Sequence, residues 1–248
     1  MLRSKKRKHN DFQSKIIVSE DFSSVGSTGY TRLKDNILYM NADGNCKVIQ
    51  IESSLSHEAK TTIISNLAVS LGITEKKVMV MDLDFRRPKL HRMFKLEKEK
   101  GIAEFMQGEL EEKDIIKKTE YKNVDIITRG LEIYNPSITF LSEKFARLVE
   151  SLKEKYDYIL LDCAPVLQVS DYIHISKISD GVLFVIAYAK TTKNQVIEAI
   201  NLLKKNNIKI LGTVFSMYDR KKDKEYNPYY KYYAYSENEY EDREEQAD

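Results

Sequence analysis

The chain has 248 residues, of which 42% are apolar, and this is enough for one sizeable α/β domain with a large core. Its net charge of +2 favours neither nucleic acid nor an acidic partner, although the start is basic and the end acidic. Two cysteines without a spacing motif favour a reduced, cytoplasmic compartment. Since no run of about 18 apolar residues and no signal peptide is visible, we expect any work at a membrane to go through the surface or a partner.

Residues 1–45 are polar, and only the short amphipathic stretch 30–40 predicts a helix there. From residue 46 on, short apolar runs alternate with amphipathic stretches such as 138–156 and 192–207, which predict helices. The apolar runs predict six strands, at 46–51, 76–84, 123–128, 156–162, 181–188 and 208–215. This alternation predicts an α/β fold with a doubly wound, mostly parallel sheet, in which ligands bind beyond the carboxyl ends of the strands.

After residue 218 the chain is charged and lacks apolar periodicity, which predicts a flexible tail. We therefore expect three parts: a polar segment (1–45), a folded domain (46–218) and a tail (219–248). The tail is rich in tyrosine, with Tyr226, Tyr229, Tyr230, Tyr232, Tyr233, Tyr235 and Tyr240.

The stretch SSLSHEAKTT, residues 53–62, lies between the first predicted strand and the helix that follows it. A phosphate-binding P-loop stands at such a place and ends in Lys-Ser/Thr, as Lys60 and Thr61 do here. Ser54 and Ala59 replace the two glycines of that pattern, and Ala in the backbone conformation that glycine provides costs about 1–2 kcal/mol. A plain strand–loop–helix connection with a solvated lysine is the alternative.

Carboxylates follow two further strands. Asp82 and Asp84 alternate after "VMVM", so both project to one side if the strand continues that far, and Asp162 ends "YILLD". Such acids can hold Mg²⁺ directly or through water, accept a proton, or orient Thr61. Each could also be an ordinary acidic strand end. Three strand ends that each supply a group needed by a Mg–nucleotide site favour the functional interpretation.

Several stretches in this order carry a family resemblance: "AKTTIISNLAVSLG", "VMVMDLDFRRPKLHRMF", "GIAEFMQGEL", "YDYILLDCAP", "DGVLFVIAYAKTT", "ILGTVF" and the tyrosine cluster. From about residue 14 to the end, the chain resembles the bacterial tyrosine kinases (BY-kinases) of capsule and exopolysaccharide assembly, a branch of the MinD/ParA-like P-loop proteins. The loop departs from the family pattern at Ser56, His57 and Ala59, where the family has Pro, Gly and Gly.

The resemblance implies a site for ATP and Mg²⁺. It implies catalytic roles for Lys60, Asp82 and Asp84, and metal binding by Thr61, Asp84 and Asp162. It implies cofactor binding by Glu58, Ala59, Lys60, Thr61, Thr62 and Ser216, and autophosphorylation of the seven tail tyrosines.

The resemblance also implies a homo-oligomer, activation by a membrane polysaccharide co-polymerase, and reversal by a cognate tyrosine phosphatase, with no nucleic-acid partner. The protein would then be cytoplasmic, held at the inner face of the plasma membrane by its partner. Two alternatives stay open. The missing glycines fit a degenerate, regulatory paralogue without kinase activity, and the fold fits a MinD-like membrane-positioning ATPase, although the tyrosine tail argues against the latter.

Overall fold

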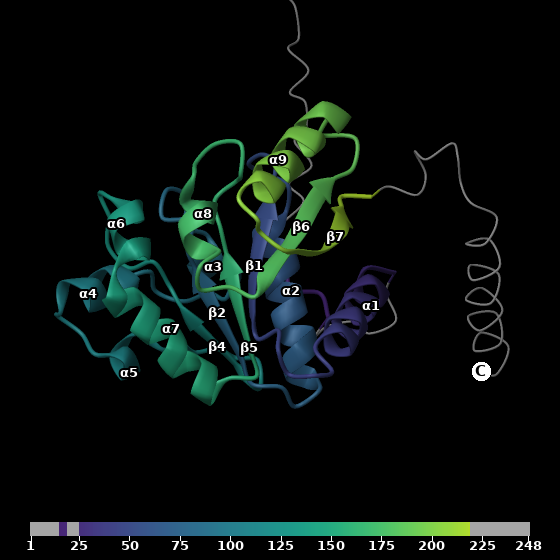
Figure 1. Ribbon diagram of the computed structural model, residues 1–248. Helices are drawn as coiled ribbons and strands as arrows, with labels where there is room; N and C mark the ends of the chain where they lie inside the picture. Colours follow the sequence, from purple (N-terminus) through teal and green to yellow (C-terminus); the bar gives the residue numbers. More distant parts are fainter. Residues whose placement is uncertain (1–14, 19–24, 219–248) are drawn as a thin grey trace, which may run out of the picture. The chain divides into compact units, whose positions relative to one another are not determined.

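The computed structural model describes residues 15–18 and 25–218, and a seven-stranded sheet forms its centre (Figure 1). The strands lie in the order β3-β4-β2-β5-β1-β6-β7 and are all parallel except β3, which runs antiparallel to β4. Their bounds are β1 (Val48–Ser53), β2 (Val78–Asp82), β3 (Lys117–Lys118), β4 (Val124–Ile127), β5 (Tyr158–Asp162), β6 (Gly181–Ala187) and β7 (Ile210–Ser216). The six predicted strands are confirmed, and the unpredicted β3 is a two-residue polar edge with no apolar run to mark it.

Helices cover both faces of the sheet, as the sequence predicts for a doubly wound fold (Figure 1). They are α1 (Val25–Met40), α2 (Lys60–Ile73), α3 (Leu90–Met93), α4 (Ile102–Gln107), α5 (Glu112–Ile115), α6 (Pro136–Leu141), α7 (Glu143–Lys155), α8 (Asp171–Ile175) and α9 (Lys193–Lys205). Apolar residues of α1 and α2 share one core with the sheet, and those of α7 share the core on the opposite face. A smaller third cluster joins α9 to β6. None of the helices in the described part of the chain has the length and apolar character needed to cross a membrane.

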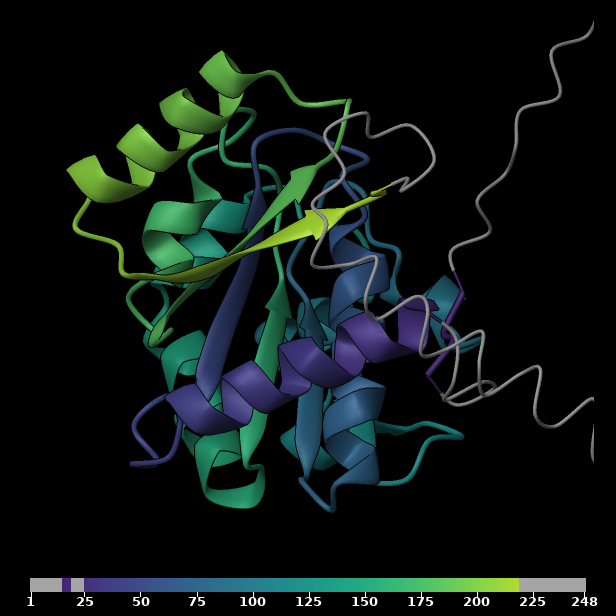
Figure 2. The same cartoon turned by 90° about the vertical axis from the view of Figure 1, so that its right-hand side faces the viewer.

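The chain divides into two compact units, residues 1–216 and 217–248. Helix α1 belongs to the first unit, begins before the predicted stretch 30–40, and packs on α2 through residues such as the buried Ile37 (Figure 2). Of the second unit only Met217 and Tyr218 lie in the described ranges. All seven predicted tail tyrosines therefore lie outside the described residues.

The helix predicted over 138–156 is in fact two helices, because Ser142 begins a new one. The backbone of Ser142 is extended, with φ −75° and ψ 141°, and its Oγ accepts the N–H of Phe145 as the N-cap of α7. The buried residues Phe145, Leu148, Val149 and Leu152 then form the face of α7 that packs on the sheet. Apolar residues keep their helical spacing on both sides of Ser142, so the sequence pattern gives no sign that a helix begins there.

The strand register brings the predicted site residues to one edge of the sheet. Strand β5 lies between β2 and β1, and it pairs Asp162 with Asp82 on one side and with Ile51 on the other. Parallel strands end at the same edge, so the loop after β1 lies beside both acids. Helix α2 begins directly after that loop and points its N-terminus at the same place.

Candidate active site

The loop between β1 and α2 takes up the conformation of a phosphate-binding loop without its glycines. His57 has a φ of 63° and Ala59 a φ of 65°, so both are in the left-handed region that glycine normally occupies. No side chain caps α2, which leaves its first backbone N–H groups available to an anion. The backbone of a phosphate loop is therefore present, although two of its residues carry side chains that disfavour it.

Lys60, the first residue of α2, is not the solvated lysine of the alternative interpretation. Its side chain is buried, and its Nζ donates to the Oγ of Ser53 at 3.0 Å. Ser53 Oγ in turn donates to the carbonyl of Leu55, at 2.8 Å, within the loop itself. The buried carboxylates of Asp162 and Glu52 lie near enough for the Lys60 charge to act on them, so the amine is held as a cation at the start of α2.

Thr61 and Asp162 form a direct contact between α2 and β5. Thr61 Oγ1 donates to Asp162 Oδ2 at 2.7 Å, and the carboxylate is buried. Burial raises the pKa of Asp162 to about 6, while the nearby charge of Lys60 opposes that rise. The sequence-based expectation that Asp162 orients Thr61 is thus matched by a hydrogen bond.

Asp82 and Asp84 have different surroundings, because β2 ends at Asp82 and Asp84 lies beyond the regular strand. Asp82 is fully buried, and its Oδ2 accepts the N–H groups of Lys89 and Leu90 at 3.0 and 3.1 Å. Its Oδ1 has no hydrogen-bond partner. Burial raises the pKa of Asp82 well above its usual value, and the charges of Asp162 and Asp84 raise it further. The three carboxylates therefore lie close enough to act on one another.

A divalent cation fits this arrangement chemically. Hydroxyl and carboxylate oxygens are the ligands that Mg²⁺ prefers, and a nucleotide-bound Mg²⁺ takes only one or two from the protein, the rest coming from phosphate and water. Residues 15–18 and 25–218 contain no group of three or more His, Cys, Asp or Glu side chains that could hold a metal alone. The unpartnered, buried Oδ1 of Asp82 is a further acceptor that a ligand or its water can satisfy.

Glu58 and Ser216 lie at the loop, and their side chains form hydrogen bonds that hold its backbone. The buried Glu58 carboxylate accepts the N–H of Leu55 at 2.6 Å through Oε2 and the hydroxyl of Thr191 through Oε1. Ser216 Oγ, at the end of β7, donates to the backbone carbonyl of Glu58 at 2.8 Å. Thr62, the remaining predicted contact residue, is half-buried in the first turn of α2.

Sequence reasoning missed several residues around the site. Lys190 Nζ donates to the carbonyl of His57, so the connection after β6 holds the loop through two consecutive side chains, Lys190 and Thr191. Arg129 Nη1 donates to the carbonyl of Phe85 at 2.8 Å and anchors the segment after the paired acids. The "AKTT" repeated after β6 was visible in the sequence, but nothing in it showed that β6 and β1 are neighbours.

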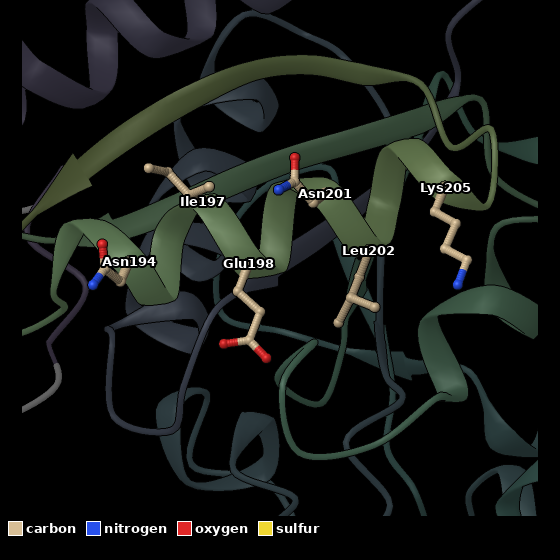
Figure 3. A pocket seen from close by; sticks show the side chains of 6 residues that line it. All are labelled: Asn194, Ile197, Glu198, Asn201, Leu202 and Lys205. Carbon is tan, nitrogen blue, oxygen red and sulfur yellow. The ribbon is translucent and has the colours of Figure 1, made fainter.

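A shallow groove elsewhere on the molecule lies along the outer side of α9 (Figure 3). It is lined by Asn194, Ile197, Glu198, Asn201, Leu202 and Lys205. None of these is a predicted site residue, and all come from one helix. The groove therefore offers no convergence of chemical groups comparable with that at the strand ends.

Comparisons with known proteins identify the family and the fold of this chain. Residues 46–212 match the AAA domain family. A candidate tyrosine-protein kinase, CapB of Staphylococcus aureus, is 30% identical over 217 residues, which is 88% of this chain and 95% of CapB.

Among solved structures, the chimerical protein CapA2B2 superposes with a TM-score of 0.78 at 30% identity, covering 82% of this chain and 89% of the other. MinD of Pyrococcus horikoshii, a septum site-determining protein solved with Mg-ADP, gives a TM-score of 0.60 at 27% identity, with 70% and 71% covered. The chain thus belongs to the AAA domain family and, within it, to the bacterial tyrosine kinases that share the MinD-like P-loop fold.

Proposed function

We propose that the protein is an ATP-dependent protein-tyrosine autokinase that acts in capsular or exopolysaccharide biosynthesis. The observation that carries this proposal is the hydrogen bond of Thr61 to Asp162 beside the buried amine of Lys60. Together they supply a metal-binding hydroxyl, an acid and a phosphate-binding cation at the N-terminus of α2. Phosphoryl transfer needs mainly such positioning and charge neutralisation.

Each residue has a role in this chemistry. Lys60, which donates to Ser53 in this structure, and the N–H groups at the start of α2 would hold the phosphates of a bound nucleotide. Thr61, Asp84 and Asp162 would hold Mg²⁺, which would neutralise charge on the phosphates.

Asp82 is the proposed acceptor of the phenolic proton. A tyrosine with a pKa of about 10 must lose that proton as its oxygen attacks phosphorus. Asp82 has one oxygen fixed by two backbone N–H groups and one oxygen free of hydrogen bonds, which is the oxygen that can accept the proton. The tail tyrosines, from Tyr226 to Tyr240, are the proposed acceptors of the phosphoryl group.

The partners follow from the family. We propose a homo-oligomer in which one subunit's tail reaches a neighbour's site, an activating membrane polysaccharide co-polymerase, and a tyrosine phosphatase that restores the unmodified tail. Each phosphate adds about −1.5 to −2 charge to a tail that is already acidic, which disfavours close packing of subunits. A cycle between assembled and dispersed forms results.

A regulatory protein without kinase activity is the second candidate, and the glycine-free loop favours it. The two are separated by incubating purified protein with Mg-ATP and probing for phosphotyrosine, beside Lys60→Met and Asp82→Ala. Signal in the wild type that both variants lack supports the kinase. Absence of signal, even with the co-polymerase's cytoplasmic peptide, supports the regulatory protein, and ATP hydrolysis without phosphotyrosine supports a MinD-like ATPase.

A further inference from the structure

The phosphate loop has to be held in its conformation by something other than its own sequence. His57 and Ala59 both have positive φ, which non-glycine residues adopt at a cost, so an unsupported loop would populate other conformations. A loop that is ordered only part of the time binds its ligand more weakly, because the apparent Kd is the intrinsic Kd divided by the fraction of time that the loop is ordered.

The support comes from the connection between β6 and α9. Thr191 Oγ1 donates to the carboxylate of Glu58, and Lys190 Nζ donates to the carbonyl of His57. His57 is itself one of the two residues with positive φ, and Glu58 lies between it and the other, Ala59. The two contacts therefore hold the loop at and between the residues whose positive φ is energetically unfavourable.

Backbone hydrogen bonds tie this connection to the end of β6. The N–H groups of Lys190 and Thr191 both donate to the carbonyl of Ala187, the last residue of β6. The next residue, Thr192, caps α9 by accepting the N–H of Gln195. Lys190 and Thr191 are therefore tied by their own backbone to the end of a buried strand, whereas the Thr192 hydroxyl serves α9 and, among the described residues, makes no hydrogen bond with the phosphate loop.

We propose that Lys190 and Thr191 are positioning residues for the phosphate loop, and that they replace the conformational freedom that glycines give such loops. This inference rests on the proposed nucleotide site. Glu58 connects the loop to Thr191, because one carboxylate oxygen accepts the N–H of Leu55 inside the loop and the other accepts the hydroxyl of Thr191 outside it. Loss of the Thr191 hydroxyl removes the second of these hydrogen bonds and destabilises the loop conformation without changing Lys60 or Thr61.

Amide hydrogen exchange in the nucleotide-free protein tests the support directly. Thr191→Val keeps the shape of the side chain but removes its hydroxyl, and we expect exchange in residues 55–61 to become about tenfold faster, as loss of a hydrogen bond to a charged group implies. Thr191→Ser restores the hydroxyl and slow exchange. Thr192→Val is the matched control, since it removes only the α9 cap. Unchanged exchange in Thr191→Val, or equal acceleration in Thr192→Val, overturns the proposal.

A double-mutant cycle with Ala59→Gly tests the link to the missing glycine. In the wild-type loop, Thr191→Val should raise the Kd for Mg-ADP about tenfold. In the Ala59→Gly background the loop needs less support, so the same change should raise the Kd no more than about threefold. Equal increases in both backgrounds contradict the proposal.

The same measurements distinguish failure of the proposed nucleotide site from failure of the positioning role. If wild-type protein takes up no Mg-ADP while loop exchange still depends on Thr191, the nucleotide site is refuted and the positioning role stands. If the wild type binds Mg-ADP and neither the loop exchange nor the Kd responds to Thr191→Val, the positioning role is refuted and the nucleotide site stands.

Discussion

Two parts of the candidate active site are built in opposite ways. The acids at the ends of β2 and β5 are placed by strand register, because Asp82 and Asp162 pair directly within a fully buried part of the sheet. The phosphate loop lies outside the sheet, and a few polar contacts from later parts of the chain hold it against its own backbone preferences. Chemistry fixed by the core tolerates changes in surface residues, whereas a loop fixed by single contacts depends on each of them.

The largest expected effect comes from Lys60, where the two parts meet. Lys60→Met removes the cation but keeps the length of the apolar stem, so the fold should survive. Since a buried cation facing phosphate is worth several kcal/mol, we expect tyrosine phosphorylation to fall at least about 100-fold. Quantitative phosphotyrosine blots at saturating Mg-ATP measure this, and circular dichroism confirms folding. Activity within about threefold of the wild type would contradict the role given to Lys60.

Asp82→Asn separates the role of this acid in the phosphorylation step from any role in nucleotide binding. The amide oxygen can still accept the N–H groups of Lys89 and Leu90, but it is no base. We expect the rate of phosphorylation to fall by about 100-fold or more, while the Kd for Mg-ATP changes less than about threefold. Single-turnover phosphorylation with calorimetry measures both, and a variant that keeps the wild-type rate shows that another group takes the proton.

The six longer strands and the placing of the acids at one edge of the sheet could be predicted from the sequence, because buried strands are short apolar runs and parallel strands end at one edge, but the order of the strands could not. Lys60, Thr61, Asp82 and Asp162 indeed lie together. The support for the loop could not be predicted. Contacts such as Thr191 to Glu58 join residues far apart in the chain, and their existence depends on β6 lying beside β1. The helix break at Ser142 could not be predicted either, since a serine between regularly spaced apolar residues can cap a helix or face solvent.

Ala59→Gly tests whether the backbone of the phosphate loop is strained at residue 59. Glycine adopts a φ of 65° with little strain, so we expect the free energy of unfolding to rise by roughly 0.5–1 kcal/mol. Ala68→Gly, inside the same helix α2, is the matched control and should lower it by at least about 0.5–1 kcal/mol. Urea unfolding measures both. A loss of stability in Ala59→Gly would show that the loop carries no strain there.

A comparably small effect is expected for Arg86, which lies at the surface beside the acids. Its guanidinium is half-exposed and 3.6 Å from the carboxylate of Asp171. Solvent screens the pair only on the side of Arg86, because the Asp171 carboxylate is buried, so Arg86→Met should lower the free energy of unfolding by about 1 kcal/mol. Urea unfolding measures the change, and a loss above about 2 kcal/mol would mean that surface contacts, and not the sheet alone, fix the acids.

The central claim is that the groups after β1, β2 and β5 form one site for a magnesium-bound nucleotide. Calorimetric titration of the wild type and Thr61→Val with ATP, in Mg²⁺ and then in EDTA, tests it most directly. We predict saturable binding to the wild type that weakens at least about tenfold in EDTA, and a Thr61→Val variant whose binding no longer responds to Mg²⁺. No binding at millimolar Mg-ATP, or binding that is indifferent to both magnesium and Thr61, would contradict the claim.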